Sequence, residues 1–271
     1  MGGPTSGRDG LRRADRITSI LDRLSHHHDV VASQLAAEFG VSSATLRRDL
    51  QLLEDQHLLA RTHGGARAQD LSYELPVRYR SGRHKEAKRA IAAYAAGRLP
   101  RGRLTVGLTG GTTTSAVARC IAERVDLTVV TNALNIGYEL ALRPRLDVIM
   151  TGGITRTQSY ELVGPIADRA LAELNLQVAV VGADGVSVAG LTTHDVVEAH
   201  TNQMMISRAE RVIVVADGSK IGATLVARMC ALDDVSELVT DTSADPQAVE
   251  ALRQAGLEVH LVSAGDVVDQ E

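Results

Sequence analysis

Hydrophobic residues in the first 60 positions follow the spacing of short helices. Four of them mark one apolar face of a first helix at the spacing i, i+3, i+4 and i+7: Ile17, Ile20, Leu21 and Leu24. A second helix is expected over residues 32–39, because Gly40 follows it where a left-handed capping residue is common. Ser42 then stands where the N-cap of a third helix, residues 43–56, would lie.

The expected third helix separates apolar from polar positions. Three leucines form its core face and three polar residues lie off that face: Leu46, Leu50 and Leu53, then Arg47, Arg48 and Gln51. Two helices joined by a tight turn, the second with a polar outer face, form a helix-turn-helix. Residues 58–67 contain Gly64-Gly65 and predict a hairpin, the wing of a winged helix. A three-helix bundle with a surface hairpin would fit the same spacing.

The pattern changes after this segment. Residues 69–82 mix polar residues, Pro and Gly without a clear period, which is typical of a linker. A helix over 85–99 follows, and helices then alternate with apolar strands expected at residues 104–108, 128–131, 147–150, 178–181, 211–216, 237–240 and 258–261. Such strands predict a mainly parallel sheet covered on both faces. The predicted organisation is a tail (1–10), an α+β winged helix-turn-helix domain (11–68), a linker (69–82) and an α/β, Rossmann-like domain (83–265).

Charge and composition narrow the classes of function. The net charge of −4 argues against a protein that coats nucleic acid indiscriminately, but the charges are unevenly distributed. Residues 1–67 carry nine Lys and Arg against eight Asp and Glu, and the remainder carries twenty against twenty-five. A weakly basic head on an acidic body is compatible with focused DNA binding. With no Trp and a single Phe, the chain offers few rings for stacking unpaired bases, which disfavours single-strand binding.

The sequence shows no sign of export or membrane insertion. It has no apolar stretch long enough to cross a bilayer, and its first ten residues lack the apolar region of a signal peptide. Cys120 and Cys230 lie far apart and are expected to be reduced thiols in the core. The three histidines 26–28 are expected in a solvated loop, since three consecutive residues cannot converge on one ion. These features predict a cytoplasmic protein with no metal site and no membrane partner.

The residues that follow the predicted strands are the candidates for ligand binding, because ligands of an α/β sheet gather at the carboxyl ends of its strands. The first strand is followed by Thr109-Gly110-Gly111-Thr112-Thr113-Thr114 and then a helix. Backbone amides at two glycines, threonine hydroxyls and a helix N-terminus suit a phosphate. The loop lacks the Lys of an ATP-binding P-loop and the glycine spacing of a dinucleotide site, so no cofactor is expected. An ordinary strand-to-helix turn is the alternative.

Other strand ends are polar as well. They contain Thr131-Asn132, Thr151-Gly152-Gly153, Gly182-Ala183-Asp184-Gly185 and Asp217-Gly218-Ser219-Lys220. Together these residues predict a polar ligand site. Asp184, Glu198 and Lys220 are the charged candidates to contact sugar hydroxyls or to transfer protons. Each of the three could instead be a helix cap or one half of a surface ion pair.

Two sets of motifs resemble the DeoR family of bacterial regulators. In the N-terminal region the resemblance lies in Val41-Ser42-x-x-Thr45-Leu46-Arg47-Arg48-Asp49-Leu50-x-x-Leu53-Glu54 and in Leu58-Leu59-x-Arg61-x-His63-Gly64-Gly65-Ala66. In the C-terminal region it lies in Gly111-Thr112-Thr113, Thr131-Asn132, Gly152-Gly153, Gly190-Leu191-Thr192-Thr193, Glu198 and Asp217-x-Ser219-Lys220. The resemblance covers about residues 11–265, which is nearly the whole chain.

The resemblance implies a sensor domain related in fold to ribose-5-phosphate isomerase and glucosamine-6-phosphate deaminase. It therefore also implies recognition of a phosphorylated sugar, in agreement with the threonine-rich loop. One position departs from the family pattern. Many members carry an Asp before the Gly-Thr-Thr run, where this chain has Thr109. The departure does not affect the phosphate hypothesis, but it leaves the identity of the sugar open.

The favoured function is a transcriptional repressor of carbohydrate metabolism genes, released from double-stranded operator DNA by a phosphorylated sugar or polyol. Contacts with DNA are expected from the third helix and the wing: Ser42, Ser43, Thr45, Arg47, Arg48, Gln51, Arg61 and His63. Arg48 could instead pair with Asp49 or Glu54 of the protein. Contacts with the effector are expected from nine residues: Gly111, Thr112, Thr113, Asn132, Gly152, Gly153, Asp184, Glu198 and Lys220.

A single winged helix contacts only a few base pairs, so a homodimer or homotetramer is expected on repeated half-sites. The alternative function is enzymatic: a sugar-phosphate isomerase or deaminase-like enzyme fused to a DNA-binding head. Asp184, Glu198 and Lys220 are residue types that such chemistry would need. Those enzymes have no need of a winged helix, however, so a regulator without catalytic activity is favoured.

Overall fold

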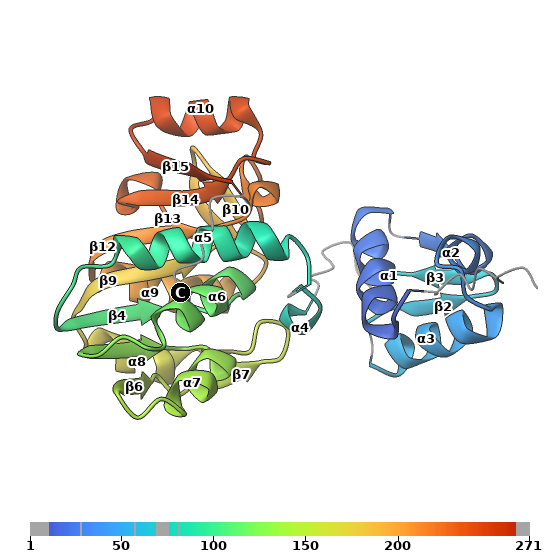
Figure 1. Cartoon of the computed structure of the whole chain (residues 1–271), viewed down its shortest axis with the longest axis horizontal. Coiled ribbons are helices and arrows are strands. Elements are labelled where there is room, and N and C mark those ends of the chain that lie inside the picture. Colours follow the sequence, from blue (N-terminus) through green and yellow to red (C-terminus); the bar gives the residue numbers. More distant parts are fainter. Residues whose placement is uncertain (1–10, 28, 57, 69–75, 81, 264–271) are drawn as a thin grey trace, which may run out of the picture. The chain divides into compact units, whose positions relative to one another are not determined.

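A computed structural model describes residues 11–27, 29–56, 58–68, 76–80 and 82–263 of the chain (Figure 1). The chain divides into two compact units, Met1–Arg83 and His84–Glu271. The predicted tail and residues 69–75 and 81 of the predicted linker lie outside the described residues. Among the described residues, no helix combines the length and the apolar character needed to cross a membrane.

The N-terminal unit contains the predicted helix-turn-helix and wing (Figure 1). Its elements are α1 (Arg13–His27), β1 (Asp29–Val31), α2 (Ala32–Glu38), α3 (Ser43–Asp55), β2 (Ala60–Thr62) and β3 (Gly65–Arg67). Gly40, in the turn between α2 and α3, has the left-handed φ of 65° that its position predicts. The apolar faces of the three helices meet in one core with Leu58, Leu59 and Ala66 of the wing segment.

The sheet of this unit has three strands rather than the two of a simple wing. Its order is β1-β3-β2, and all pairs are antiparallel. The sequence pattern predicts a loop at the histidine run, but α1 continues to His27 and Asp29 begins β1. Val30 explains the extra strand, because its side chain is buried and it pairs with Ala66.

The segment expected to be a linker contains a short helix. α4 (Val77–Arg80) packs against α1, and the side chain of Val77 is buried. The Tyr79 hydroxyl donates a hydrogen bond to Gln56 Oε1 at 2.6 Å, and Arg83 forms an ion pair with Asp22. Residues 77–83 therefore belong structurally to the winged-helix unit.

The C-terminal unit is built on a seven-stranded parallel sheet, in the order β15-β14-β12-β9-β4-β5-β6. Every predicted strand is confirmed within two residues at each end: β4 (Leu104–Leu108), β5 (Leu127–Thr131), β6 (Leu146–Met150), β9 (Leu176–Gly182), β12 (Ala209–Val215), β14 (Glu237–Asp241) and β15 (Glu258–Val262). Branched aliphatic residues fill these strands because both faces of the sheet are covered.

Two hydrophobic cores cover the two faces of the sheet. One face packs against α5 (Lys85–Arg98), α6 (Thr112–Ile121) and α7 (Leu134–Ala141). The other packs against α8 (Pro165–Ala172), α9 (Val196–Ser207), α10 (Pro246–Gln254) and a small sheet of β10 (Gly185–Ser187), β11 (Gly190–Thr193) and β13 (Ala227–Cys230). Cys230 is buried, as expected, but Cys120 is exposed on α6, so the expectation of two core thiols is wrong for Cys120.

The order of the strands fixes where a ligand site is expected. From β4 the chain adds β5 and β6 on one side, and it then returns to place β9 and later strands on the other side. Ligands of such sheets bind beyond the carboxyl ends of the strands where the order reverses, which is between β4 and β9 here. A hairpin of β7 (Ile154–Arg156) and β8 (Glu161–Val163) joins this carboxyl edge, because Leu162 N–H donates to Asn132 O just after β5.

Candidate functional site

The outer face of α3 presents two arginines to solvent. Arg47 and Arg48 are exposed, and neither makes an ion pair or hydrogen bond with another described residue. Asp49, next to them, is buried and pairs with Arg16 of α1, whose Nε and NH2 atoms both lie 2.8 Å from Asp49 Oδ2. Asp49 therefore connects two helices of the core. The alternative in which Arg48 pairs with Asp49 or Glu54 is not observed.

Ser42 caps α3, as its position predicts. Its Oγ accepts a hydrogen bond from the Thr45 N–H at 3.1 Å, and the two hydroxyl oxygens lie 2.9 Å apart. This bond satisfies one of the amides that the helix start leaves open. Ser43 is the first residue of the helix and is exposed. Contacts of these three residues with DNA stay a prediction.

The wing is tied to α3 by polar side chains. Arg61 NH1 donates to Gln51 Oε1, and the Arg61 N–H donates to Glu54 Oε1 at 3.1 Å. Gln51 also donates to Asp55 Oδ1 at 2.9 Å. Gln51 and Arg61 therefore fix the wing against the helix, an interaction that the sequence pattern does not predict. His63 lies in the turn between β2 and β3 and is exposed.

In the C-terminal unit, the loop between β4 and α6 has the features of an anion site. Gly111 is the N-cap of α6 and has a φ of 121°, a conformation that favours glycine. The Thr114 hydroxyl donates to Gly110 O and Gly111 O at 2.8 and 3.0 Å, which stabilises the turn. The hydroxyls of Thr112 and Thr113 have no partner among the described residues. They and the first amides of the helix are therefore available to a ligand.

Thr109, the position that departs from the family pattern, is fully buried. Its N–H donates to Val180 O at 3.3 Å, and its hydroxyl accepts from the Gly182 N–H at 3.0 Å. The residue joins the ends of β4 and β9 where the strand order reverses. These two hydrogen bonds show that Thr109 positions the loop.

The three predicted charged residues of the site are brought together. Lys220 Nζ lies 3.4 Å from Asp184 Oδ1, and Asp184 Oδ2 lies 3.2 Å from the Thr193 hydroxyl. The same hydroxyl lies 2.9 Å from Glu198 Oε1, and Arg156 NH1 donates to Glu198 Oε2 at 3.1 Å. One polar network therefore links the end of β9, α9, the segment after β12 and the β7–β8 hairpin.

Asn132 belongs to a second, buried cluster beside this network. Its Nδ2 donates to Glu161 Oε2 at 3.0 Å and to Asn202 Oδ1 at 3.1 Å. Glu161 is buried and closely packed against the loop, because a Cβ added to Gly110 would lie 2.3 Å from Glu161 Oε1. Burial and the nearby charge of Glu198 raise the pKa of the Glu161 carboxyl well above its usual value.

Asp217 is the buried anion at the end of β12. Burial raises its pKa, but the hydrogen bond from Ser219 and the charges of Lys88, His84 and Lys220 outweigh burial, so the pKa of Asp217 is lower than usual. Lys88 of α5 is itself buried, with Nζ 3.8 Å from Asp217 Oδ2. The pair holds the loop that contains Lys220 against α5.

Gly152 and Gly153 have a clear backbone role. Their φ values are 70° and 128°, and a Cβ on Gly153 would lie 2.9 Å from Val163 O of the hairpin. They follow β6, which is the edge strand two positions from β4. Their glycine character is therefore explained by the turn into β7, and their contact with effector stays a prediction.

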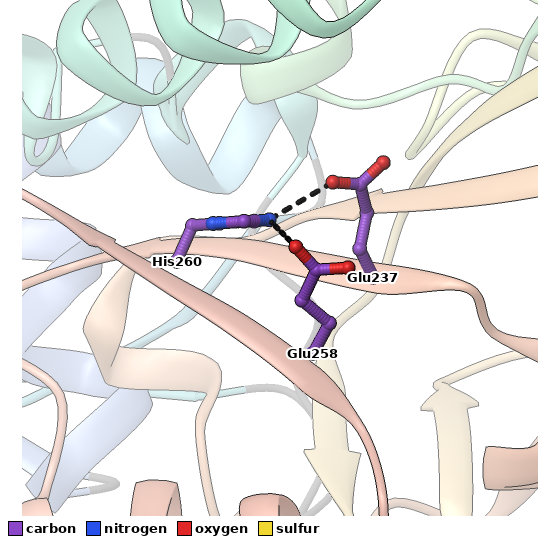
Figure 2. A group of neighbouring side chains, drawn as sticks. All are labelled: Glu237, Glu258 and His260. Carbon is purple, nitrogen blue, oxygen red and sulfur yellow. Dashed lines mark hydrogen bonds and ion pairs between the residues drawn. The ribbon is translucent and has the colours of Figure 1, made fainter.

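A different charged cluster lies at the amino edge of the same sheet, where β14 and β15 begin (Figure 2). His260 Nε2 is 3.0 Å from both Glu237 Oε2 and Glu258 Oε1. Arg98 Nε lies 2.9 Å from Glu237 Oε2, and Arg211 pairs with the other oxygen of Glu237. The spacing of the Glu and His ligand atoms would suit a cation, but the two guanidiniums already balance the buried carboxylate. We assign this cluster a structural role.

Four polar residues that lie at the carboxyl edge are not among those that the sequence predicts for the site. Arg156 and Glu161 lie on strands of three residues, which are too short to show a hydrophobic period. Lys88 and Asn202 are buried on the apolar faces of α5 and α9. A charged or amide residue at a core position of a helix was the signal available in the sequence for these last two.

Comparison with known proteins matches both units of the chain. The family model of the DeoR-like helix-turn-helix domain matches residues 16–71, and that of the DeoR C-terminal sensor domain matches residues 83–242. The HTH-type transcriptional regulator GlpR of Haloferax volcanii is 33% identical over 248 residues, which cover 91% of this chain and 96% of that protein. The glycerol-3-phosphate regulon repressor of Escherichia coli strain K12 is 28% identical over 252 residues, which cover 93% of this chain and all of that protein.

Solved structures give a more distant likeness. Ribose 5-phosphate isomerase A of Methanocaldococcus jannaschii has a TM-score of 0.38 and 17% identity, over 53% of this chain and 55% of that one. This likeness is too distant for an argument about function. The two family models and the full-length relatives favour a regulator over an isomerase or deaminase. The chain belongs to the DeoR family, and it is a DNA-binding transcriptional regulator.

Proposed function

We propose that the protein represses genes of carbohydrate metabolism and leaves its operator when a phosphorylated sugar or polyol binds the C-terminal unit. The observation that best supports this proposal is the loop at residues 110–114. It lies at the reversal of strand order, precedes a helix N-terminus and leaves the Thr112 and Thr113 hydroxyls without a partner among the described residues. One relative is named for the regulon of a polyol phosphate, glycerol 3-phosphate.

Within this proposal the phosphate and the sugar have separate partners. Gly111, Thr112 and Thr113 bind the phosphate through amides and hydroxyls. Asn132, Asp184, Glu198 and Lys220 then contact the hydroxyl groups, with Gly152 and Gly153 at the far side of the site. The polar network of Asp184, Thr193 and Glu198 supports this division, because it places several acceptors on adjoining elements.

We infer that α3 enters the major groove of operator DNA. The exposed, unpaired Arg47 and Arg48 support this placement, as does the capped, positive end of the helix. Ser42, Ser43 and Thr45 contact the DNA near the helix start. Gln51 positions Arg61, and Arg61 and His63 of the wing reach the adjacent backbone.

We infer a DNA-binding domain at 11–68 and a sensor domain at 83–265, and the presence of two compact units supports this division. The helix α4 and Arg83 both pack on the DNA-binding unit. The protein acts in the cytoplasm, where its operator is. It binds the operator as a homodimer or homotetramer, because one winged helix contacts too few base pairs for specific affinity.

Operator release by matched pairs of compounds tests this function. Sugar phosphates and polyol phosphates are each compared with their unphosphorylated counterparts, first by calorimetry and then by operator release. We expect at least one phosphorylated compound to bind and release the operator, and its unphosphorylated counterpart to bind far more weakly. Equal affinity within every pair would contradict the phosphate site while leaving DNA binding unaffected. Conversion of the bound compound to a product would instead support the enzyme alternative.

A further inference from the structure

Glu161 is a buried carboxyl group that the proposed function leaves without a role. Its side chain extends from β8 to the carboxyl edge of the sheet and is 3% exposed. Its contacts there are amides: Asn132 Nδ2 donates to Oε2 at 3.0 Å, and Asn202 supplies a further hydrogen bond. Its other carboxyl oxygen lies against the backbone of Gly110, in the loop at residues 110–114.

Of the two neighbouring carboxyls, Glu161 and Glu198, only Glu198 is paired with a cation among the described residues. Glu198 of α9 accepts from Arg156 at 3.1 Å and from the Thr193 hydroxyl at 2.9 Å. Arg156 is further held by Asp195, 3.4 Å away. The cation of the β7–β8 hairpin therefore stabilises a negative Glu198, whereas Glu161 makes no ion pair with a described residue.

The cluster around Glu161 is also short of hydrogen-bond donors. Asn132 Oδ1 is buried and has no hydrogen-bond partner among the described residues. Asn132 Nδ2 already serves two acceptors, Glu161 and Asn202. A negative Glu161 would add acceptor capacity where donors are lacking, and a buried charge without a cation is strongly disfavoured. A proton on Glu161 supplies a donor and removes the charge.

We propose that Glu161 is a positioning residue of the effector site that is kept as a neutral carboxylic acid, so that no negative charge lies behind the loop that binds the anion. The charged groups acting on it are Glu198 of α9 and Arg156 of β7, and the raised pKa of Glu161 agrees with this geometry. The inference rests on the proposed phosphate site. It adds that binding of an anion at residues 111–113 is linked to a proton on Glu161.

The first test observes the carboxyl directly and needs no effector. The ¹³C carboxyl resonances of the full-length, glutamate-labelled protein are followed from pH 5 to 9, and Glu161→Gln identifies the resonance of interest. We expect a carboxyl that is still protonated at pH 7. A Glu161 resonance that is already that of a carboxylate at pH 7 would overturn the proposal.

The second test measures anion binding with sulfate, whose charge is constant over this range. Above the pKa of Glu161, the wild-type affinity for sulfate is expected to fall with pH, by up to about tenfold per pH unit, the limit for one linked proton. Glu161→Gln should bind sulfate with little dependence on pH, and Glu210→Gln, at an exposed glutamate of β12, should follow the wild type. If Glu161 stays protonated to pH 9, all three profiles should be flat, and a wild-type affinity that still falls with pH while the Glu161→Gln profile is flat would refute the link. If Glu161 titrates in this range but the wild-type affinity for sulfate does not change with pH, the link between the proton and anion binding is refuted.

A third measurement covers the case in which Glu161→Gln does not fold. Calorimetry of sulfate binding to the wild type, in two buffers of different ionisation enthalpy, counts the protons taken up. Uptake that rises as Glu161 titrates supports the proposal, and no uptake while it titrates contradicts it. If sulfate fails to bind any of these proteins, the phosphate site is wrong, and the carboxyl resonance still decides the state of Glu161.

Discussion

The two edges of the parallel sheet each bury a glutamate, but the groups that surround the two carboxyls differ in charge. At the amino edge, Glu237 is 1% exposed and contacts His260 (Figure 2). Arg98 and Arg211 also form ion pairs with it. At the carboxyl edge, Glu161 is 3% exposed and faces two asparagines and a second carboxylate. The first arrangement balances its charge within the protein. The second supplies no ion pair for Glu161 among the described residues, and it is the edge at which we propose that the effector binds.

The same difference separates the two faces of α3. Asp49 on the inner face is buried and paired with Arg16, whereas Arg47 on the outer face is exposed and unpaired. Two charged residues of one motif, two positions apart, thus differ in whether the protein itself supplies a partner. Where a charge is satisfied internally, its removal should affect stability, and where it is not, its removal should affect binding.

The largest effect is expected from Glu237→Gln at the amino edge. The substitution removes the charge that Arg98 and Arg211 share, and breaking a buried ion pair destabilises by about 3–5 kcal/mol. We expect the lower end of that range, because the two arginine side chains are 35% and 32% exposed. Chemical denaturation measures the loss, and operator and effector affinities of the folded protein should not change.

Glu258 is the matched control for this prediction. It also contacts His260, but its side chain is 58% exposed. Glu258→Gln should therefore destabilise by at most about 1 kcal/mol, as surface ion pairs do. If the two variants lost equal free energy of unfolding, the burial of Glu237 would not be the cause of its larger contribution to stability.

The next effect is expected from Thr112→Ala at the carboxyl edge. If its hydroxyl donates to a phosphate, losing one charge-assisted hydrogen bond should weaken effector binding roughly 10- to 100-fold, from about 1.5–3 kcal/mol. Stability should change little, because this hydroxyl has no partner among the described residues. Operator binding should persist while release by effector becomes poor, since coupling between the two ligands is reciprocal.

Thr155→Ala, at an exposed threonine of β7, is the control for this substitution. It should keep wild-type affinity for the effector and wild-type release of the operator. Unchanged effector affinity in Thr112→Ala would contradict the assignment of the loop to phosphate.

The sequence predicts the parallel sheet and the helix-turn-helix well because both follow from hydrophobic periodicity. Each strand of the sheet is rich in branched aliphatic residues, and α3 places its leucines at helical spacing. β1 is missed because a strand of three residues with one buried side chain has no measurable period. The short helix α4 is missed for a similar reason, since its four residues show only one buried side chain, Val77.

The candidate site is predicted where residues directly follow a strand, and it is missed where the chain folds back from elsewhere. Gly111, Asn132 and Asp184 follow their strands and lie at the carboxyl edge, as the topology of α/β sheets dictates. Glu161 and Arg156 arrive on a hairpin after β6, so their proximity to Gly110 and Glu198 depends on tertiary packing. Sequence spacing alone contains no information about that return.

The smallest effect is expected at the outer face of α3, from Arg47→Ala. Because Arg47 is exposed and has no described partner, its loss should leave the free energy of unfolding unchanged. Operator affinity should fall by about 1–3 kcal/mol if Arg47 contacts a base, or the salt dependence should fall by about one unit of slope if it contacts only phosphate. Titration of operator DNA at several salt concentrations separates the two cases.

Arg23→Ala is the control, because Arg23 is an exposed arginine of the same unit that pairs with Glu38 instead. If Arg47→Ala binds the operator like the wild type at every salt concentration, α3 does not contact DNA through this residue, and exposed charge on this unit is not a guide to its DNA-binding face.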